Sequence, residues 1–212
     1  MEESPLNVLR RFAKPRAAAH PVAPERCELC RAVLPASHRH LLEVASRQVI
    51  CACDPCALRF EGVIGGRFKL IPRDPRALPG FRLSDAQWAN LAIPIGLAFF
   101  FFSTPEGKMT AMYPSPAGAT ESLLPLTAWE ELVSENPPLG RMEPDTEALL
   151  VNRLGPTPSH YVVPIDACYE LVGLIRLYWR GLSGGDDLWR EIGAFFARLE
   201  RQAGGLREGA RA

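Results

Sequence analysis

The sequence predicts an α+β protein in which a small cysteine-rich module packs on a larger sheet with helices on one face. Three observations predict this fold class. Five of the six cysteines lie between positions 27 and 56, a continuous apolar run covers residues 95–102, and two helical stripes of apolar residues occupy the C-terminal third. A chain of 212 residues can form one large domain or a small module attached to a larger one.

The formal net charge of the chain is zero, but the charge is unevenly spread. Residues 1–80 carry 13 Lys/Arg against 8 Asp/Glu, a net +5, and residues 81–212 carry a net −5. A charge of +5 over eighty residues is too small to indicate a nucleic-acid-binding domain. It suits an acidic partner protein, or the acidic half of the same chain, equally well.

No targeting or membrane segment is expected from the pattern. The first residues are acidic and no apolar run follows them. The most apolar stretch, residues 91–102, is twelve residues long and contains Pro94, whereas a membrane-spanning helix needs about twenty. We therefore expect a cytoplasmic protein, in which reduced cysteines that cluster bind metal more often than they form disulfides.

Two Cys-x-x-Cys pairs predict a metal site. Cys27 and Cys30 form the first pair, and Cys53 and Cys56 follow after twenty-two residues. Four thiolates complete the tetrahedral shell of a structural zinc ion, with no open position for catalytic water. An iron–sulfur cluster on the same four cysteines is the alternative, because such clusters also take four thiolates.

Residues 26–72 are predicted to form the zinc module, after an irregular N-terminal arm at residues 1–25. Within it, β-prone runs at 41–44 and 48–50 flank a turn of hairpin length, and residues 57–60 suit the first turn of a helix. This order is typical of a treble-clef module. A zinc ribbon is the competing layout and would need a second hairpin instead of the helix. Residues 68–71 are expected to add a strand.

Residues 73–80 are the expected linker to an α+β domain at 81–201. Capping-box patterns at Ser84 and Thr127 predict the starts of two helices, and the expected strands are 95–102, 108–113, 148–151 and 161–165. These elements predict a sheet of four or five strands. Because strands alternate with helices after residue 125, a partly parallel sheet is possible.

The C-terminal third predicts two amphipathic helices. Asp166 suits the N-cap of a helix over 167–180, and a second helix begins at Asp186 and Asp187. A flexible tail is expected over 202–212. The apolar stripes of the two helices are Leu171, Leu174, Ile175, Tyr178 and Trp179 in the first, and Leu188, Ile192, Phe195, Phe196 and Leu199 in the second.

Four further features are candidate sites. Cys51 could replace Cys53 as a ligand, because the two face the same side of an extended strand, or it could be a buried apolar residue. His38 and His40 are expected to orient the metal thiolates or cap the hairpin. Cys168 begins a helix, which favours a thiolate, but it is expected to be a packing residue. The small-residue loop 114–122 has no phosphate-binding pattern, so a supporting loop is favoured over a binding loop.

Several strings together resemble a family whose members are otherwise uncharacterised. They are residues 25–30, 38–42, 93–100, 113–122 and 163–173. The chain resembles, from about residue 25 to 200, a bacterial domain-of-unknown-function family whose genes often lie beside those of nickel–iron uptake hydrogenases. The resemblance implies a cytoplasmic accessory or assembly protein, whose partner would be a hydrogenase subunit or maturation factor. It carries over no catalytic residue.

Three hypotheses about function follow. The first is a non-catalytic zinc-binding accessory protein, favoured because no catalytic constellation is visible. The second is a thiol-based metal- or sulfur-transfer protein that uses Cys51 or Cys168. The third is a treble-clef nucleic-acid binder, which would use basic side chains of the module: Arg39, Arg47, Arg59, Arg67 and Lys69.

Overall fold

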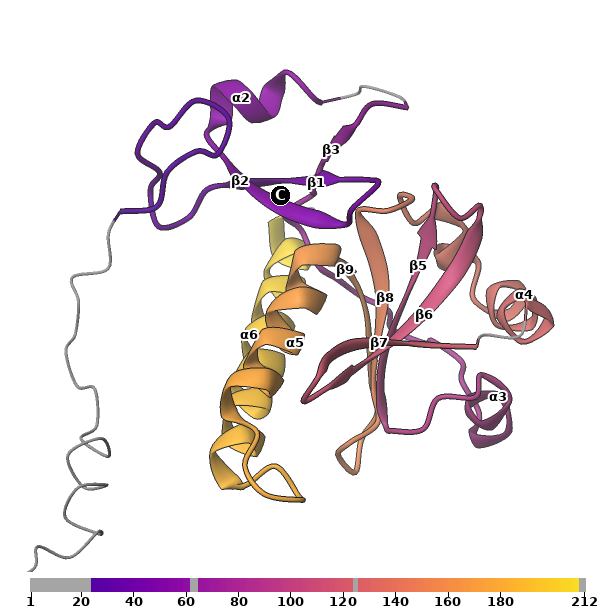
Figure 1. Ribbon diagram of the computed structural model, residues 1–212. Coiled ribbons are helices and arrows are strands. Elements are labelled where there is room, and N and C mark those ends of the chain that lie inside the picture. Colours follow the sequence, from indigo (N-terminus) through magenta and orange to yellow (C-terminus); the bar gives the residue numbers. More distant parts are fainter. Residues whose placement is uncertain (1–23, 62–64, 124–125, 210–212) are drawn as a thin grey trace, which may run out of the picture.

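The fold was obtained as a computed structural model, which describes residues 24–61, 65–123 and 126–209 (Figure 1). The expected arm at 1–25 lies almost wholly outside the described residues. The described residues form a three-stranded sheet and a six-stranded sheet, with helices packed on the larger one. The fold is therefore α+β. None of the described helices combines the length and the apolar character that crossing a membrane requires.

The predicted hairpin of the module is confirmed. Strands β1 (Arg39–Glu43) and β2 (Gln48–Ala52) pair antiparallel, with Glu43 opposite Gln48 next to the turn. The turn uses Arg47 in the left-handed region, at φ 57°. Helix α2 (Asp54–Leu58) starts three residues earlier than expected, because Cys53 and Pro55 already provide a helix start. Strand β3 (Phe68–Leu70) then pairs antiparallel with β1.

The larger sheet has six strands among the described residues, in the order β4-β9-β8-β5-β6-β7. Its strands are β4 (Arg76–Ala77), β5 (Leu97–Ser103), β6 (Lys108–Ser115), β7 (Gly118–Ser122), β8 (Glu147–Asn152) and β9 (Ser159–Pro164). Every pairing is antiparallel, so the expectation of a partly parallel sheet was wrong. The expectation of four or five strands was also wrong, because both edges carry a short additional strand.

Both additional strands lie in segments for which the sequence predicts a linker or a loop. Strand β4 lies within the expected linker 73–80 and pairs with β9. Strand β7 lies within the expected loop 114–122, where β6 and β7 form a tight hairpin around residues 116–117. Gly118 has φ 128°, and the Ser115 hydroxyl donates to the Gly118 carbonyl across the turn. The segment 114–122 is therefore a β-hairpin at the sheet edge.

Strand β5 is buried on both faces, as its continuous apolar run predicted. Phe99 and Phe101 point into one core, beneath helices α5 (Ile165–Tyr178) and α6 (Asp186–Gly209). Phe100 points into a second core, which Trp129 of α4 (Leu126–Glu135) covers. Helices thus lie on both faces of the larger sheet (Figure 1). The expectation of helices on one face was wrong, because α3 (Asp85–Asn90) and α4 cover the second apolar face of the sheet.

Helix α3 (Asp85–Asn90) confirms the first capping box. The Ser84 hydroxyl accepts from the Gln87 backbone N–H, and the Gln87 side chain accepts from the Ser84 N–H. Helix α4 begins at Leu126, so Thr127 lies inside the helix and not at its N-cap as expected; residues 124–125 are outside the described chain. Helix α4 ends at Glu135, before Pro137 and Pro138, which begin the 3₁₀ helix η1 (Pro137–Arg141).

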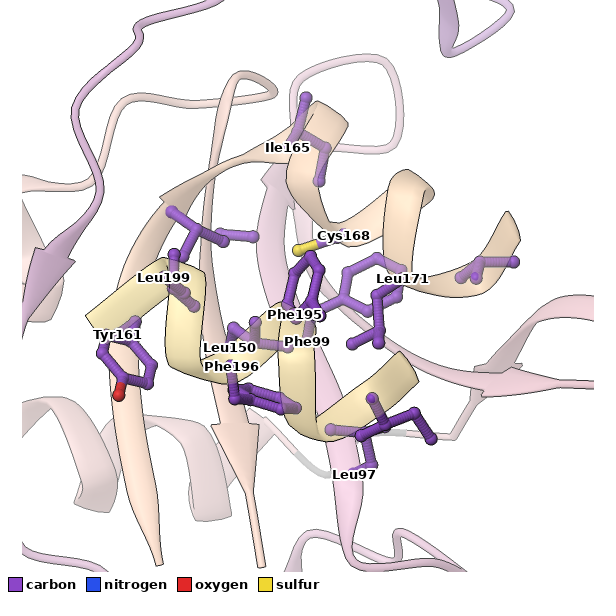
Figure 2. Packing of buried hydrophobic residues seen from close by; sticks show 14 of the residues in the cluster. Leu97, Phe99, Leu150, Tyr161, Ile165, Cys168, Leu171, Phe195, Phe196 and Leu199 are labelled. Carbon is purple, nitrogen blue, oxygen red and sulfur yellow. The ribbon is translucent and has the colours of Figure 1, made fainter. Parts of the chain in front are cut away.

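Helices α5 and α6 pack side by side on one face of the sheet, and Figure 2 shows side chains of both gathered in the core. The predicted stripe of α6 is confirmed, since all five of its residues are buried. In α5, Leu171 and Ile175 are buried and the other stripe residues pack at the margin. The N-cap of α5 is Pro164, so Asp166 was wrongly assigned as the cap; it lies in the first turn. Helix α6 continues past residue 202 to Gly209.

The module contacts the rest of the chain through apolar and charged side chains. Leu42 and Ile71, each 2% exposed, belong to the same core as the strands and helices of the larger sheet. The Lys69 ammonium donates to the nearly buried Asp145 carboxylate at 2.5 Å. Arg47 pairs with Glu106. The division into a module at 26–72 and a domain at 81–201 stays a prediction. Substitutions at these contacts would test it.

His160 on β9 predicts a pH dependence of stability. Burial, with a smaller contribution from the charge of Arg153, lowers the pKa of His160 to about 4 from an ordinary 6.5. Its ring packs at a tilt against that of Phe81, with the ring centroids 4.5 Å apart. The unfolded chain therefore binds a proton that the folded chain excludes, so stability is lost as the pH falls from about 6.5 towards about 4. Because the ring is only half-buried, we expect a loss of about 1–2 kcal/mol.

Denaturant unfolding between pH 7 and pH 4.5 measures this effect. The wild type should lose more stability over the interval than His160→Asn, which cannot titrate. Parallel profiles for the two proteins would show that His160 is not responsible.

Candidate metal centre

The first cysteine pair lies on a tight turn that follows an isolated bridge. The Arg31 N–H donates to the Cys27 carbonyl at 2.7 Å, and the Cys27 N–H donates to the Ala32 carbonyl at 2.8 Å. Arg31 takes the left-handed conformation, at φ 67°, and the Arg26–Val33 bridge closes the loop. The turn leaves Cys27 buried and Cys30 exposed, with the two sulfurs on the same side.

The second pair lies at the start of helix α2. Cys53 is the N-cap residue in extended conformation, and Cys56 lies in the first turn. Between them, Asp54 places an acidic group at the helix start and Pro55 fits a position where no backbone donor is needed. The Ala57 N–H donates to the Cys53 carbonyl at 2.9 Å. The helix start thus fixes how the two side chains project.

The structure brings the two pairs together. The sulfurs of Cys27, Cys30, Cys53 and Cys56 all lie within 4.8 Å of one another, and all six cysteines are free thiols. The Cys30 and Cys53 sulfurs are 3.6 Å apart. Two sulfurs bound tetrahedrally to zinc at about 2.3 Å would be separated by about 3.8 Å. The spacing therefore matches what a single metal ion such as zinc requires.

The four thiols also differ in acidity. Burial alone would raise the pKa of Cys27, but hydrogen bonds from the backbone N–H groups of Cys53, Cys30 and Leu29 bring it down to about 6. The pKa of Cys56 is raised to about 12, chiefly because its thiol shares hydrogen bonds with Cys53 and Cys30. The Cys27 sulfur is therefore a thiolate near neutral pH, while the raised pKa values of Cys53 and Cys56 keep the protons on those two thiols. A cation placed among them would displace those protons.

Cys51 lies apart from the four. Its ligand atom lies within 4.8 Å of those of His38 and His40, in a group that shares no residue with the four. Its backbone holds the first turn in place: the Cys51 N–H donates to the Glu28 carboxylate at 2.8 Å, and the Cys51 carbonyl accepts from the Glu28 N–H at 2.9 Å. The alternative in which Cys51 substitutes for Cys53 gains no support from this geometry.

The two histidines have partners that the sequence did not indicate. His40 is hydrogen-bonded to Asp166 in α5, with Nδ1 and Oδ2 2.6 Å apart. His38 Nδ1 lies 3.0 Å from the Pro35 carbonyl. Among the hydrogen bonds of the described residues, none joins either histidine to the four thiols, so the expectation that they orient the thiolates gains no support. Asp166 was missed as a functional residue because it lies 126 positions from His40 in sequence.

Cys168 is a packing residue, as expected. It is fully buried in α5, and Figure 2 shows it beside Phe195 in the core. Burial raises the pKa of its thiol well above the ordinary value, and the nearby Asp166 adds to the effect. A thiol in this state is not a nucleophile near neutral pH.

Fold and site together define an α+β protein with a four-cysteine cluster that could bind a metal ion such as zinc. Over residues 26–203 the sequence matches the family of unknown function DUF5947, and the chain belongs to that family. Searches of curated proteins and of solved structures gave no match. The family description names no activity, so function must be inferred from the site.

Proposed function

We propose that this chain is a non-catalytic zinc-binding accessory or assembly protein whose four-cysteine module is a treble clef. The observation that carries the proposal is the gathering of Cys27, Cys30, Cys53 and Cys56 within 4.8 Å. One pair comes from a turn and the other from the start of α2, with the β1–β2 hairpin between them in sequence. Strand β3 pairs with β1 and so extends the first hairpin. A zinc ribbon would instead have a second hairpin at the second cysteine pair.

The role of the zinc would be structural. Four thiolates fill the coordination shell, so no position is left for water or substrate. The module's own buried core is small; it comprises Cys27, Leu34, Leu41, Ile50, Ala52 and Ala57. Such a core contributes little folding free energy, and metal binding would supply the remainder. An iron–sulfur cluster on the same thiolates is the competing occupant, distinguished by its iron and labile sulfide.

The proposed partner is a subunit or maturation factor of a cytoplasmic nickel–iron hydrogenase system. This part rests on the family resemblance described above. Affinity capture of the tagged chain from its native host should recover a hydrogenase or maturation component above the level of a tag-only control. Recovery of none would remove the hydrogenase setting and leave the zinc proposal standing, since zinc binding is measured separately.

Nucleic-acid binding loses support from the way the module's basic residues are used. Arg39 pairs with Asp54, and Arg67 with Glu43. Arg47 pairs with Glu106 and Lys69 with Asp145, in loops that flank strands of the larger sheet. Four of the five basic residues named for this function are thus paired with carboxylates. A phosphate-binding surface needs cations that are free to face the ligand.

We therefore expect no mobility shift of DNA or RNA by the zinc-loaded chain at low salt. A mobility shift, with an affinity for nucleic acid that falls steeply as salt is added, would contradict this expectation and support the hypothesis of a treble-clef nucleic-acid-binding protein.

A further inference from the structure

A second cluster of metal-binding side chains lies beside the hairpin. His40 on β1 stands opposite Cys51 on β2 in the strand register, and His38 precedes β1 by one residue. One ligand atom from each of the three lies within 4.8 Å of the other two. None of the three belongs to the four-cysteine cluster, so the two groups share no ligand.

The hydrogen bonds of the two rings fix their orientation. His40 Nδ1 faces the Asp166 carboxylate at 2.6 Å. His38 Nδ1 faces the Pro35 carbonyl at 3.0 Å and the Glu25 carboxylate at 3.6 Å. Carbonyl and carboxylate oxygens accept hydrogen bonds, so in both rings Nδ1 carries the hydrogen. Each ring then presents the lone pair of Nε2 on its opposite side.

The two Nε2 atoms face each other at 3.2 Å. Two lone pairs at this distance repel unless a cation lies between them, and that cation is either a proton or a metal ion. Two imidazole nitrogens bound tetrahedrally to zinc at 2.0–2.1 Å would be about 3.3–3.4 Å apart. The observed separation agrees with a shared metal ion, and the Cys51 sulfur is within reach as a third ligand.

The surroundings resemble those of metal sites that exchange a ligand. Asp166 on His40, and Glu25 with Pro35 on His38, are the carboxylate and carbonyl partners that orient metal-bound histidines. His38, His40 and Asp166 also line a pocket of about 530 Å³ between the module and helices α5 and α6. Two of the three ligands, His38 and His40, thus face the pocket, and a site with three protein ligands leaves a fourth position for water or a small ligand.

We propose that His38, His40 and Cys51 form a second, open metal site for a transition-metal ion that accepts both imidazole and thiolate. Zinc and copper fit this donor set best. Asp166 would be a positioning residue, linking the metal on the module to helix α5. The site differs from the four-cysteine site in having an exchangeable position that faces the pocket.

Titration of the metal-stripped, reduced full chain with Co²⁺ tests the proposal, since Co²⁺ occupies tetrahedral zinc sites and absorbs visible light. We expect two equivalents to bind, the second with a thiolate charge-transfer band about one quarter as intense as the first, because one thiolate replaces four. Small anions such as azide should alter only the spectrum of the second equivalent. Binding of only one equivalent of Co²⁺ in all conditions would overturn the proposal. The close approach of the two Nε2 atoms would then be explained by a proton shared between the histidines.

Variants separate this site from the four-cysteine site. His40→Ala and Cys51→Ser should lose the second equivalent and keep the first. Cys53→Ser is expected to loosen the module that carries both sites, so it should lose the intense four-thiolate band and weaken the second site as well. Asp166→Asn keeps all three ligands and should weaken the second site about 10–100-fold, and this milder change guards against a folding defect. His160→Asn removes a histidine elsewhere and should bind two equivalents. A second equivalent retained in both His40→Ala and Cys51→Ser would contradict the assignment.

Discussion

Cys53→Ser is expected to release one metal ion per chain and to loosen residues 26–72, while the larger sheet stays folded. The reason is the unequal size of the cores. The module's core has few large side chains, whereas the larger sheet is covered on both faces by apolar cores of its own. A core of that size offsets its chain entropy without metal, and the module does not. The variant should keep most of its helical circular dichroism, and proteolysis should cut first within 26–72.

Hydrogen exchange on strands β5 and β6 decides between this outcome and its competitor. Leu42 and Ile71 of the module share the core of the larger sheet, so loss of the module could melt the whole chain in one transition. Protection lost in β5 as completely as in β1 would contradict separable folding. Cys168→Ser is the matched control, because it places the same polar change in the other core and should leave the metal content unchanged.

Phe99→Ala is expected to destabilise the chain by about 3–5 kcal/mol, a large part of the 5–15 kcal/mol typical of a domain. Phe99 is fully buried in the central strand, where it contacts Phe101 and meets the Tyr169 ring edge-on. Figure 2 shows it among side chains of α5 and α6. Truncation would leave a cavity that close-packed neighbours on a sheet and two helices cannot fill.

Phe102→Ala provides the control on the same strand. Phe102 is 37% exposed, so its truncation should cost clearly less. Chemical denaturation of the two variants measures the difference. Equal losses would show that strand β5 is not buried in the way its side-chain pattern indicates.

The sequence predicted best those features that depend on neighbours in the chain. The β1–β2 hairpin, the Ser84 capping box and the apolar stripe of α6 are encoded within a few residues, and all three are present. The edge strands β4 and β7 were missed because their residues carry no alternating pattern and become strands only by pairing with β9 and β6. Segments with many Pro and Gly were therefore read as irregular.

The candidate sites show the same difference between features encoded locally and features that depend on long-range contacts. Spacing alone was enough to predict that the four cysteines of the two pairs would meet. It could not reveal that Cys51 joins His38 and His40, because that depends on strand register. The contact between His40 and Asp166 depends on how α5 packs under the module, and no local signal encodes it.

The metal content of the reduced, purified chain tests the central claim most directly. Elemental analysis of the wild type and of Cys53→Ser, with an absorption spectrum of each, needs no assumption about the partner. We expect the wild type to hold at least one tightly bound zinc ion with no iron or labile sulfide, and Cys53→Ser to hold at least one fewer. A metal-free wild type, an iron–sulfur spectrum, or a Cys53→Ser variant with undiminished zinc would contradict a structural zinc site on Cys27, Cys30, Cys53 and Cys56.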